Sequence, residues 1–318
     1  MKILLGCVNS AVSLVGYDLE THQPFWYCPG NRLRACGVHF YENALWVSSD
    51  STLKKIAHDG ITVMELPGPH ENFAHSVKPL GEDCIGVVDT GNSRVTIFSG
   101  GRCVTHYSPL ENWPFEIPCD AIHLNDILPW KDGILASAFS YQPFQPNKDS
   151  CPTWNSDGLG VLFYMRKYKN NLISTIIASG LNCPHSITEY NGDIYCCSSS
   201  TGTFYRLRQN IAGILTQDAA WHVTETHFLR GCLRVDSGWI LGGSSQRFAR
   251  DDEKGGMVLF HLSDAGAVTQ YPVAGVGEIY DIIPWDGDIM RDVAEQVLRL
   301  PDMPLEGTFP APCTAFFA

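Results

Sequence analysis

A degenerate segment recurs six times along the chain, at a period of roughly 40 to 50 residues. Each copy has a polar or His-containing start, an apolar run, a turn of Gly, Asn or Asp, and then a strand of small residues. The clearest copies begin at 75–77, 123–126 and 184–186, and the others begin at Arg230, Glu278 and 34–36. Repeats of this length, built from short strands and tight turns, are typical of a β-propeller.

The strand runs between these starts are short and bounded by Gly, Asn, Asp and Pro. No amphipathic helix separates them, so the pattern favours antiparallel four-stranded blades over parallel βαβ units. The fold class predicted is all-β, a six-bladed β-propeller. Five blades are predicted at 33–66, 73–106, 120–179, 183–217 and 226–273.

The sixth blade is split between the two ends of the chain. Its inner strand is predicted at 278–283, and the sequence that follows turns into a predicted helix over 292–299. The N-terminal segments 3–6, 12–18 and 24–27 match strands two to four of the other repeats. Pairing the ends in one blade closes the ring and removes open sheet edges. We therefore predict a propeller over 1–288 and a C-terminal helix and tail over 289–318.

Composition excludes several classes of partner. The formal net charge is -12 and no run of Lys or Arg is present, which argues against nucleic acid. No apolar run approaches the roughly 18 residues of a membrane span, and the N-terminus has the pattern of a strand rather than of an export signal. The 12 cysteines include no Cys-x-x-Cys pair, so we expect free thiols and a cytoplasmic location.

Two insertions interrupt the repeat between the second and third strands of their blades. They cover 140–158 in blade three and 246–254 in blade five. In a propeller such loops open on the face where the inner strands begin. Both are therefore predicted to overhang that mouth of the channel, where long loops with Pro and aromatic residues often act as lids.

The segment 87–98, which reads Val-Val-Asp-Thr-Gly-Asn-Ser-Arg-Val-Thr-Ile-Phe, resembles the consensus of an NHL repeat, a propeller blade motif. Across most of 70–285, the segments 123–126, 184–186, 229–231 and 278–281 resemble an uncharacterised family of propeller proteins. These resemblances imply the fold and supply no activity.

Among characterised six-bladed propellers, the chain is similar in kind to the lyase that cleaves peptidyl hydroxyglycine, to strictosidine synthase and to gluconolactonase-like hydrolases. That resemblance implies a site at the central channel, with a divalent metal in several members. No catalytic residue is carried over from them, because their residues do not align one by one with this chain.

The repeat frame places five polar residues at equivalent starts of inner strands, which line the channel. Three of them are histidines, and together with one carboxylate they form a candidate divalent-metal site for zinc, iron or manganese: His75, His123, His185 and Glu278. The alternative is a set of channel-lining polar groups bonded to backbone and water.

Further candidates lie beside this ring. The segments that follow His123 and Glu278 are near copies, so Asp126 and Tyr280 are candidates for proton transfer, and Asn125 for substrate binding. The repeated Asp could instead orient a ligand histidine or cap a strand. Arg230 and Arg34 could bind an anionic substrate through the guanidinium, although Arg230 could also pair with Glu278 or Asp281.

The sequence thus predicts a metal-assisted enzyme of lyase, hydrolase or isomerase type that acts on a small anionic or amide-containing molecule. The alternative, from a different class, is a non-catalytic propeller that binds a peptide or protein. Exposed aromatic residues would then anchor the partner, namely Trp113, Phe115, Tyr141 and Trp154.

Overall fold

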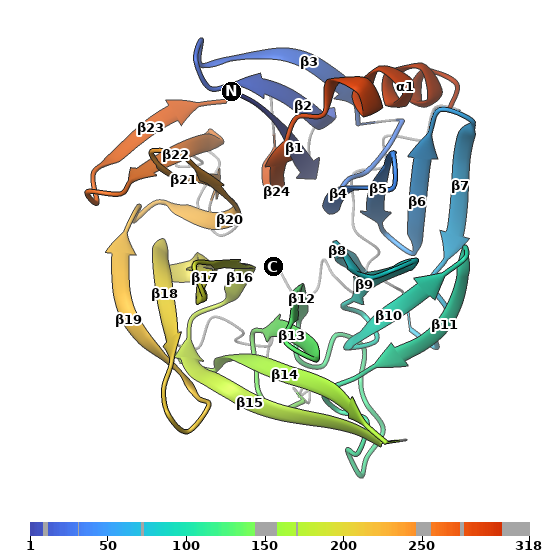
Figure 1. Ribbon diagram of the computed structural model, residues 1–318, viewed down its shortest axis with the longest axis vertical. Coiled ribbons are helices and arrows are strands. Elements are labelled where there is room, and N and C mark those ends of the chain that lie inside the picture. The colour runs from blue at the N-terminus through green and yellow to red at the C-terminus, as the bar shows by residue number, and fades with distance from the viewer. Residues whose placement is uncertain are drawn as a thin grey trace, which may run out of the picture.

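The computed structural model describes residues 1–8, 12–30, 32–70, 73–143, 158–169, 171–245, 256–273 and 277–300. Six four-stranded antiparallel sheets stand around a central channel (Figure 1). In each sheet the strands follow one another from the channel outward. The predicted six-bladed β-propeller is therefore confirmed.

Blades one to five are each continuous in sequence. Blade one holds β4 (Gly37–Tyr41), β5 (Ala44–Ser49), β6 (Thr52–Ala57) and β7 (Gly60–Glu65). Blade two holds β8 (Ala74–Gly81), β9 (Cys84–Asp89), β10 (Arg94–Ser99) and β11 (Arg102–Tyr107). Blade three holds β12 (Leu124–Trp130), β13 (Gly133–Ala138), β14 (Gly160–Tyr168) and β15 (Asn171–Leu181). Blade four holds β16 (Pro184–Tyr190), β17 (Asp193–Ser198), β18 (Thr203–Gln209) and β19 (Leu215–His222), with the short 3-10 turn η1 (Ser199–Thr201). Blade five holds β20 (His227–Val235), β21 (Gly238–Ser245), β22 (Val258–Ser263) and β23 (Val268–Pro272).

The sixth blade joins the two ends of the chain, as the sequence predicted. Its inner strand is β24 (Glu278–Pro284), and its outer strands are β1 (Lys2–Val8), β2 (Val12–Asp18) and β3 (Gln23–Pro29). β24 pairs antiparallel with β1, with Leu4 opposite Ile283 and Leu5 opposite Ile282 (Figure 1). This pairing closes the ring.

The core consists of six apolar clusters, each between two neighbouring blades. The split blade contributes to two of them, through Leu4 and Leu14 on one side and Leu5 and Val15 on the other. Burial of apolar surface thus joins the split blade to both neighbours, in the same way as every other blade.

The helix α1 (Gly287–Leu298) begins earlier than predicted. The Asp286 side chain caps it by accepting from the backbone N–H groups of Asp288 and Ile289. Val293 and Val297 pack into the cluster between blades six and one. The expected tail from 301 onward lies outside the described residues. In the described ranges no helix has the length and hydropathy needed to cross a membrane, and ten cysteines carry free thiols.

The NHL-like segment forms a tight turn between β9 and β10. The buried Asp89 carboxylate accepts from Asn92 Nδ2 at 3.0 Å and from Arg94 Nε at 3.0 Å. Burial raises the pKa of Asp89, and both partners oppose that shift. The Asp, Asn and Arg of the motif therefore fix the shape of this turn.

Candidate functional site

The strand pairings define one equivalent channel position in every blade. In blades one to five, the last paired residue of the inner strand lies opposite the residue three positions later in the chain, such as Trp130 opposite Gly133 or Tyr190 opposite Asp193. The residue five positions before this last paired residue is equivalent in each of these blades. In blade two it is six positions before, because β8 has one extra residue near its end. Tyr280 completes the set through the match of its strand to that of Asn125. These six residues, here called the channel ring, are Cys36, His75, Asn125, His185, Arg230 and Tyr280.

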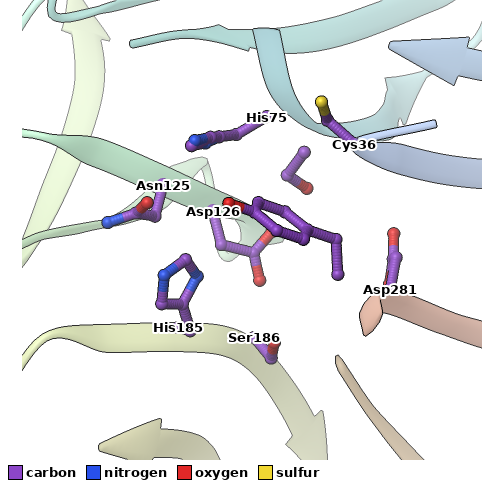
Figure 2. Close-up of a pocket in the computed structure, with 9 residues that line it drawn as sticks. Cys36, His75, Asn125, Asp126, His185, Ser186 and Asp281 are labelled. Carbon is purple, nitrogen blue, oxygen red and sulfur yellow. The ribbon is translucent and has the colours of Figure 1, made fainter. Parts of the chain in front are cut away.

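A pocket opens at this level of the channel (Figure 2). Five ring residues line it, all but Arg230, together with the residues that follow four of them, Ser76, Asp126, Ser186 and Asp281. Figure 2 shows His75, Asn125 and His185 converging on the pocket from three different strands. Five of the six blades thus contribute polar groups to a small space.

β-bulges explain why these side chains reach the pocket. The inner strands of blades two to six all shift register at this level, which leaves residues such as Ser76, Asn125, Ser186, Gly231 and Tyr280 outside the regular pairing. A bulge turns a side chain away from the alternation of the strand and often lies beside an active site.

The register corrects the alignment made from sequence. His75, His185 and Arg230 are equivalent as predicted, but His123 and Glu278 lie two residues before the ring positions of their blades. The alignment matched the first His or charged residue of each repeat, and in blades three and six this residue comes two positions before the one that faces the pocket. His123 and Glu278 therefore belong to the rim above the ring.

The three histidines and Tyr280 nevertheless surround the same space. The ring centroid of His75 lies 5.4 Å from that of His123, 6.4 Å from that of His185 and 5.6 Å from that of Tyr280. The His185 and Tyr280 centroids are 6.5 Å apart. Phe139 closes one side, with its ring 4.5 Å from His123 and 5.3 Å from His185.

His123 has a carboxylate partner that the sequence did not point out. Its Nδ1 lies 2.8 Å from Oδ2 and 3.0 Å from Oδ1 of Asp120, in the turn that leads into β12. Burial raises the pKa of Asp120, and the neighbouring imidazole opposes that shift. The Asn125 Nδ2 donates to the His123 carbonyl at 2.8 Å, which identifies the amide nitrogen of that side chain.

The two arginines named from sequence are both in ion pairs. Arg230, buried, contacts the Glu278 carboxylate at 2.5 Å and stacks on Tyr280 with its Cζ 4.3 Å from the ring centroid. Arg34, on the rim of blade one, contacts Asp50 at 3.2 Å. The pairing of Arg230 with Glu278 is one of the two alternatives left open by the sequence.

Asp126 and Asp281 tie neighbouring blades together. The Asp126 carboxylate accepts from the N–H of Ile127 at 2.8 Å and from that of Ile187, on the next blade, at 2.7 Å. Asp281 repeats the arrangement with Ile282 at 3.0 Å and Val38 at 3.2 Å. Burial raises the pKa of Asp126 to about 6, opposed mainly by Lys78. The repeated Asp thus binds backbone N–H groups of two neighbouring inner strands, at positions inside the strands and not at their ends.

Lys78 crosses the channel directly below the pocket. Its Nζ lies 3.5 Å from Asp281 Oδ2, although the two residues belong to blades two and six. Burial alone would lower the pKa of Lys78, but Asp281 and Asp126 raise it above its ordinary value. A second cavity lies beneath, lined by Lys78, Asp126 and Asp281 and by the largely apolar lower part of the channel. The ammonium therefore lines the second cavity, beside the two carboxylates that this cavity shares with the pocket.

The sequence did not predict three residues of the site, and most of the two insertions lies outside the described residues. Asp120, Phe139 and Cys36 were not predicted, although Asp120 stands three residues before His123. Burial, with a smaller contribution from Asp50, raises the pKa of Cys36 to about 12, so its thiol stays protonated. Most of both insertions, 144–157 and 246–255, lies outside the described residues, so their role as lids stays a prediction.

Comparisons with known proteins agree with the fold. No family model and no curated protein matches the chain. A Bacteroides caccae protein of unknown function is 17% identical and superposes with a TM-score of 0.60, over 89% of this chain and 98% of that one. A catalytically inactive variant of virginiamycin B lyase from Staphylococcus aureus, solved with quinupristin, is 11% identical with a TM-score of 0.52, over 86% of this chain and 85% of that one. The calcium-binding protein regucalcin from Agrobacterium tumefaciens is 11% identical with a TM-score of 0.51, over 79% of this chain and 78% of that one. At these identities the likeness concerns the propeller fold, which is distantly shared with lyase- and lactonase-type proteins.

Proposed function

We propose that the channel mouth is the active site of an enzyme that performs acid–base chemistry of lyase, hydrolase or isomerase type on a small molecule. The observation that carries the proposal is the convergence of three imidazoles and one phenol at the channel mouth: His75, His185 and Tyr280 line the pocket, and the ring centroid of His123 lies 5.4 Å from that of His75. Histidine and tyrosine are able to take up and release protons near neutral pH when a site positions them.

The residues divide into complementary roles. One imidazole removes a proton, from a carbon in an elimination or isomerisation or from water in a hydrolysis, and the Tyr280 phenol returns a proton to the departing or rearranged oxygen. Asn125 binds an amide or hydroxyl of the substrate. Arg230, behind Tyr280, is paired with Glu278, and Lys78 is paired with Asp281, so neither brings uncompensated positive charge to the pocket, which favours an amide-containing substrate over an anionic one. Both Asp126 oxygens bind backbone, so we assign it to the scaffold instead of to proton transfer.

The likeness to virginiamycin B lyase supports this class of activity. The solved variant carries a histidine-to-alanine substitution and is catalytically inactive, so a histidine matters in that propeller. The activity proposed for this chain rests on its own histidines and not on alignment to that residue.

A panel of small lactones, esters, amides and hydroxy acids tests the proposal. Proton release reports hydrolysis, and absorbance of a new conjugated double bond reports elimination. For any substrate that the protein turns over, His123→Gln and Tyr280→Phe are each expected to lower kcat/KM about a hundredfold, because each removes one positioned proton-transfer group. His58→Gln, which changes an exposed histidine in the turn between β6 and β7, is the control. Full activity in both site variants would contradict the proposal.

A metal-dependent form of the same site, as predicted from the sequence, is a second version of this proposal. The three imidazoles suit zinc, iron or manganese, and such an ion would supply Lewis-acid polarisation of a carbonyl or a more acidic water. The fit is incomplete, since Glu278 is paired with Arg230 and the described residues contain no group of three or more His, Cys, Asp or Glu arranged to hold an ion. The calcium-binding neighbour supports only a divalent ion in general.

Metal content decides between the two versions. Plasma mass spectrometry of protein purified without an affinity tag is compared with that of a His123→Ala/His185→Ala double variant. Near-stoichiometric metal that is lost in a folded double variant would support the metal version. Absence of metal in both, with no uptake on titration with zinc, iron(II) or manganese, would leave the acid–base version alone.

A binding module is the remaining candidate, favoured by exposed aromatic side chains. Trp113 is 38% exposed, Phe115 66% and Tyr141 44%, while Trp154 lies outside the described residues. Large exposed aromatics are common anchors for protein partners. This candidate would gain support if the panel gave no turnover and if Phe115→Ser abolished capture of a partner that the wild type retained.

A further inference from the structure

We infer that Asp120 is the positioning residue that makes His123 the general base of the site, an inference that rests on the proposed function. The first observation is the contact itself. The Asp120 carboxylate meets Nδ1 of His123 at 2.8 Å, and the Asp120 residue is only 7% exposed. A carboxylate beside Nδ1 favours the tautomer that carries its proton on Nδ1. Nε2 then holds the lone pair that accepts a proton.

The second observation is that the turn is built to hold both residues. Asp120 and His123 adopt left-handed backbone conformations, with φ of 53° and 48°. Such conformations cost free energy in a residue other than glycine and persist where surrounding contacts fix them. Three contacts do so here: Asp120 N–H to the Gly91 carbonyl at 2.8 Å, Ala121 N–H to Ser93 Oγ at 3.0 Å, and Asn125 Nδ2 to the His123 carbonyl at 2.8 Å.

The third observation is that the imidazole of His123 is held from a second side. The Phe139 ring, with its centroid 4.5 Å from that of His123, limits the motion of the imidazole on one face.

Side-chain NMR of protein labelled with 15N-histidine tests the inference without a substrate. Long-range 1H–15N spectra at pH 8, assigned with His123→Gln, are expected to show His123 with the proton on Nδ1 and an unprotonated Nε2. In Asp120→Ala the Nδ1-protonated signature is expected to disappear in favour of the Nε2-protonated form, because the acceptor is gone. Asp120→Asn, which retains one oxygen, is expected to keep part of the original signature.

Two controls keep the result specific. The resonances of His58 and His261, remote from the turn, are expected to stay unchanged if the variants fold, and Asp120→Asn serves as the readout if Asp120→Ala does not fold. A wild-type His123 protonated on Nε2, or an unchanged tautomer in a folded Asp120→Ala variant, would overturn the inference. If the tautomer behaves as expected but no ligand binds, the proposed function fails and the positioning role stands.

Discussion

Lys78→Met is expected to lower the free energy of unfolding by about 3–5 kcal/mol at pH 8. Lys78 is the cation that faces both Asp281 and Asp126 below the pocket. Removing it leaves two carboxylates in the channel without a compensating charge, and an uncompensated buried charge is costly. Denaturation with urea, followed by circular dichroism, measures the loss.

The loss of stability in Lys78→Met is expected to depend on pH. Burial already raises the pKa of Asp126 to about 6, and loss of Lys78, the main opposing charge, raises it further. Protonation of Asp126 removes one of the uncompensated charges, so the deficit of the variant is expected to shrink as the pH falls from 8 to 5. Lys167→Met, on the exposed part of β14, is the matched control and should change stability by less than about 0.5 kcal/mol. A Lys78→Met protein as stable as the wild type at pH 8 would show that the ammonium does not compensate these carboxylates.

Gly37→Ala is expected to destabilise the protein by about 3 kcal/mol, although it adds only one methyl group. A Cβ at Gly37 would lie 2.4 Å from the carbonyl oxygen of His75 and 2.8 Å from the backbone nitrogen of Val77. Both are backbone atoms of the neighbouring blade, so neither is able to rotate away. The methyl group would force blades one and two apart beside the pocket.

The matched control for this change is Gly256→Ala, because no atom of the residues that the structure describes lies within 4 Å of a Cβ built there. Thermal unfolding of both variants measures the difference, and the His75 resonance in Gly37→Ala reports whether the strand has moved. Equal melting temperatures for the two variants would mean that the inner strands have more room than the structure shows.

The propeller architecture could be predicted because it depends on the order of apolar, polar and turn residues along the chain. Short strands separated by turns repeat six times, and the N-terminal segments fill the places that the last repeat leaves empty. The six inter-blade clusters need only apolar residues at alternate positions, which the sequence displays directly. The start of α1 was missed by five residues, because Asp286-Gly287 matches the Asp/Gly turn of the other repeats, whereas in the structure Asp286 is the N-cap of the helix.

The site could be predicted only in part, for reasons of local backbone geometry. His75, His185 and Tyr280 were correctly placed near one another because every inner strand begins at the same mouth. The inner strands of blades two to six carry the same one-residue bulge, so the bulge does not cause the offset of His123 and Glu278; the alignment matched residue type, and in blades three and six the first His or charged residue comes two positions early. Asp120 was missed because its contact with His123 depends on a turn with two left-handed residues, and composition does not reveal such a turn.

On the proposed function, the histidine pocket at the channel mouth binds a small polar molecule. This binding is tested by titration of the 15N-histidine protein with small carboxylates, lactones and amides, followed through the side-chain resonances. At least one class is expected to shift the His75 and His185 resonances together and saturably, and a His75→Gln/His185→Gln variant is expected to lose the binding. If none of the three classes shifts these resonances, or if binding persists unchanged in the double variant, the histidine pocket is not a binding site for such molecules.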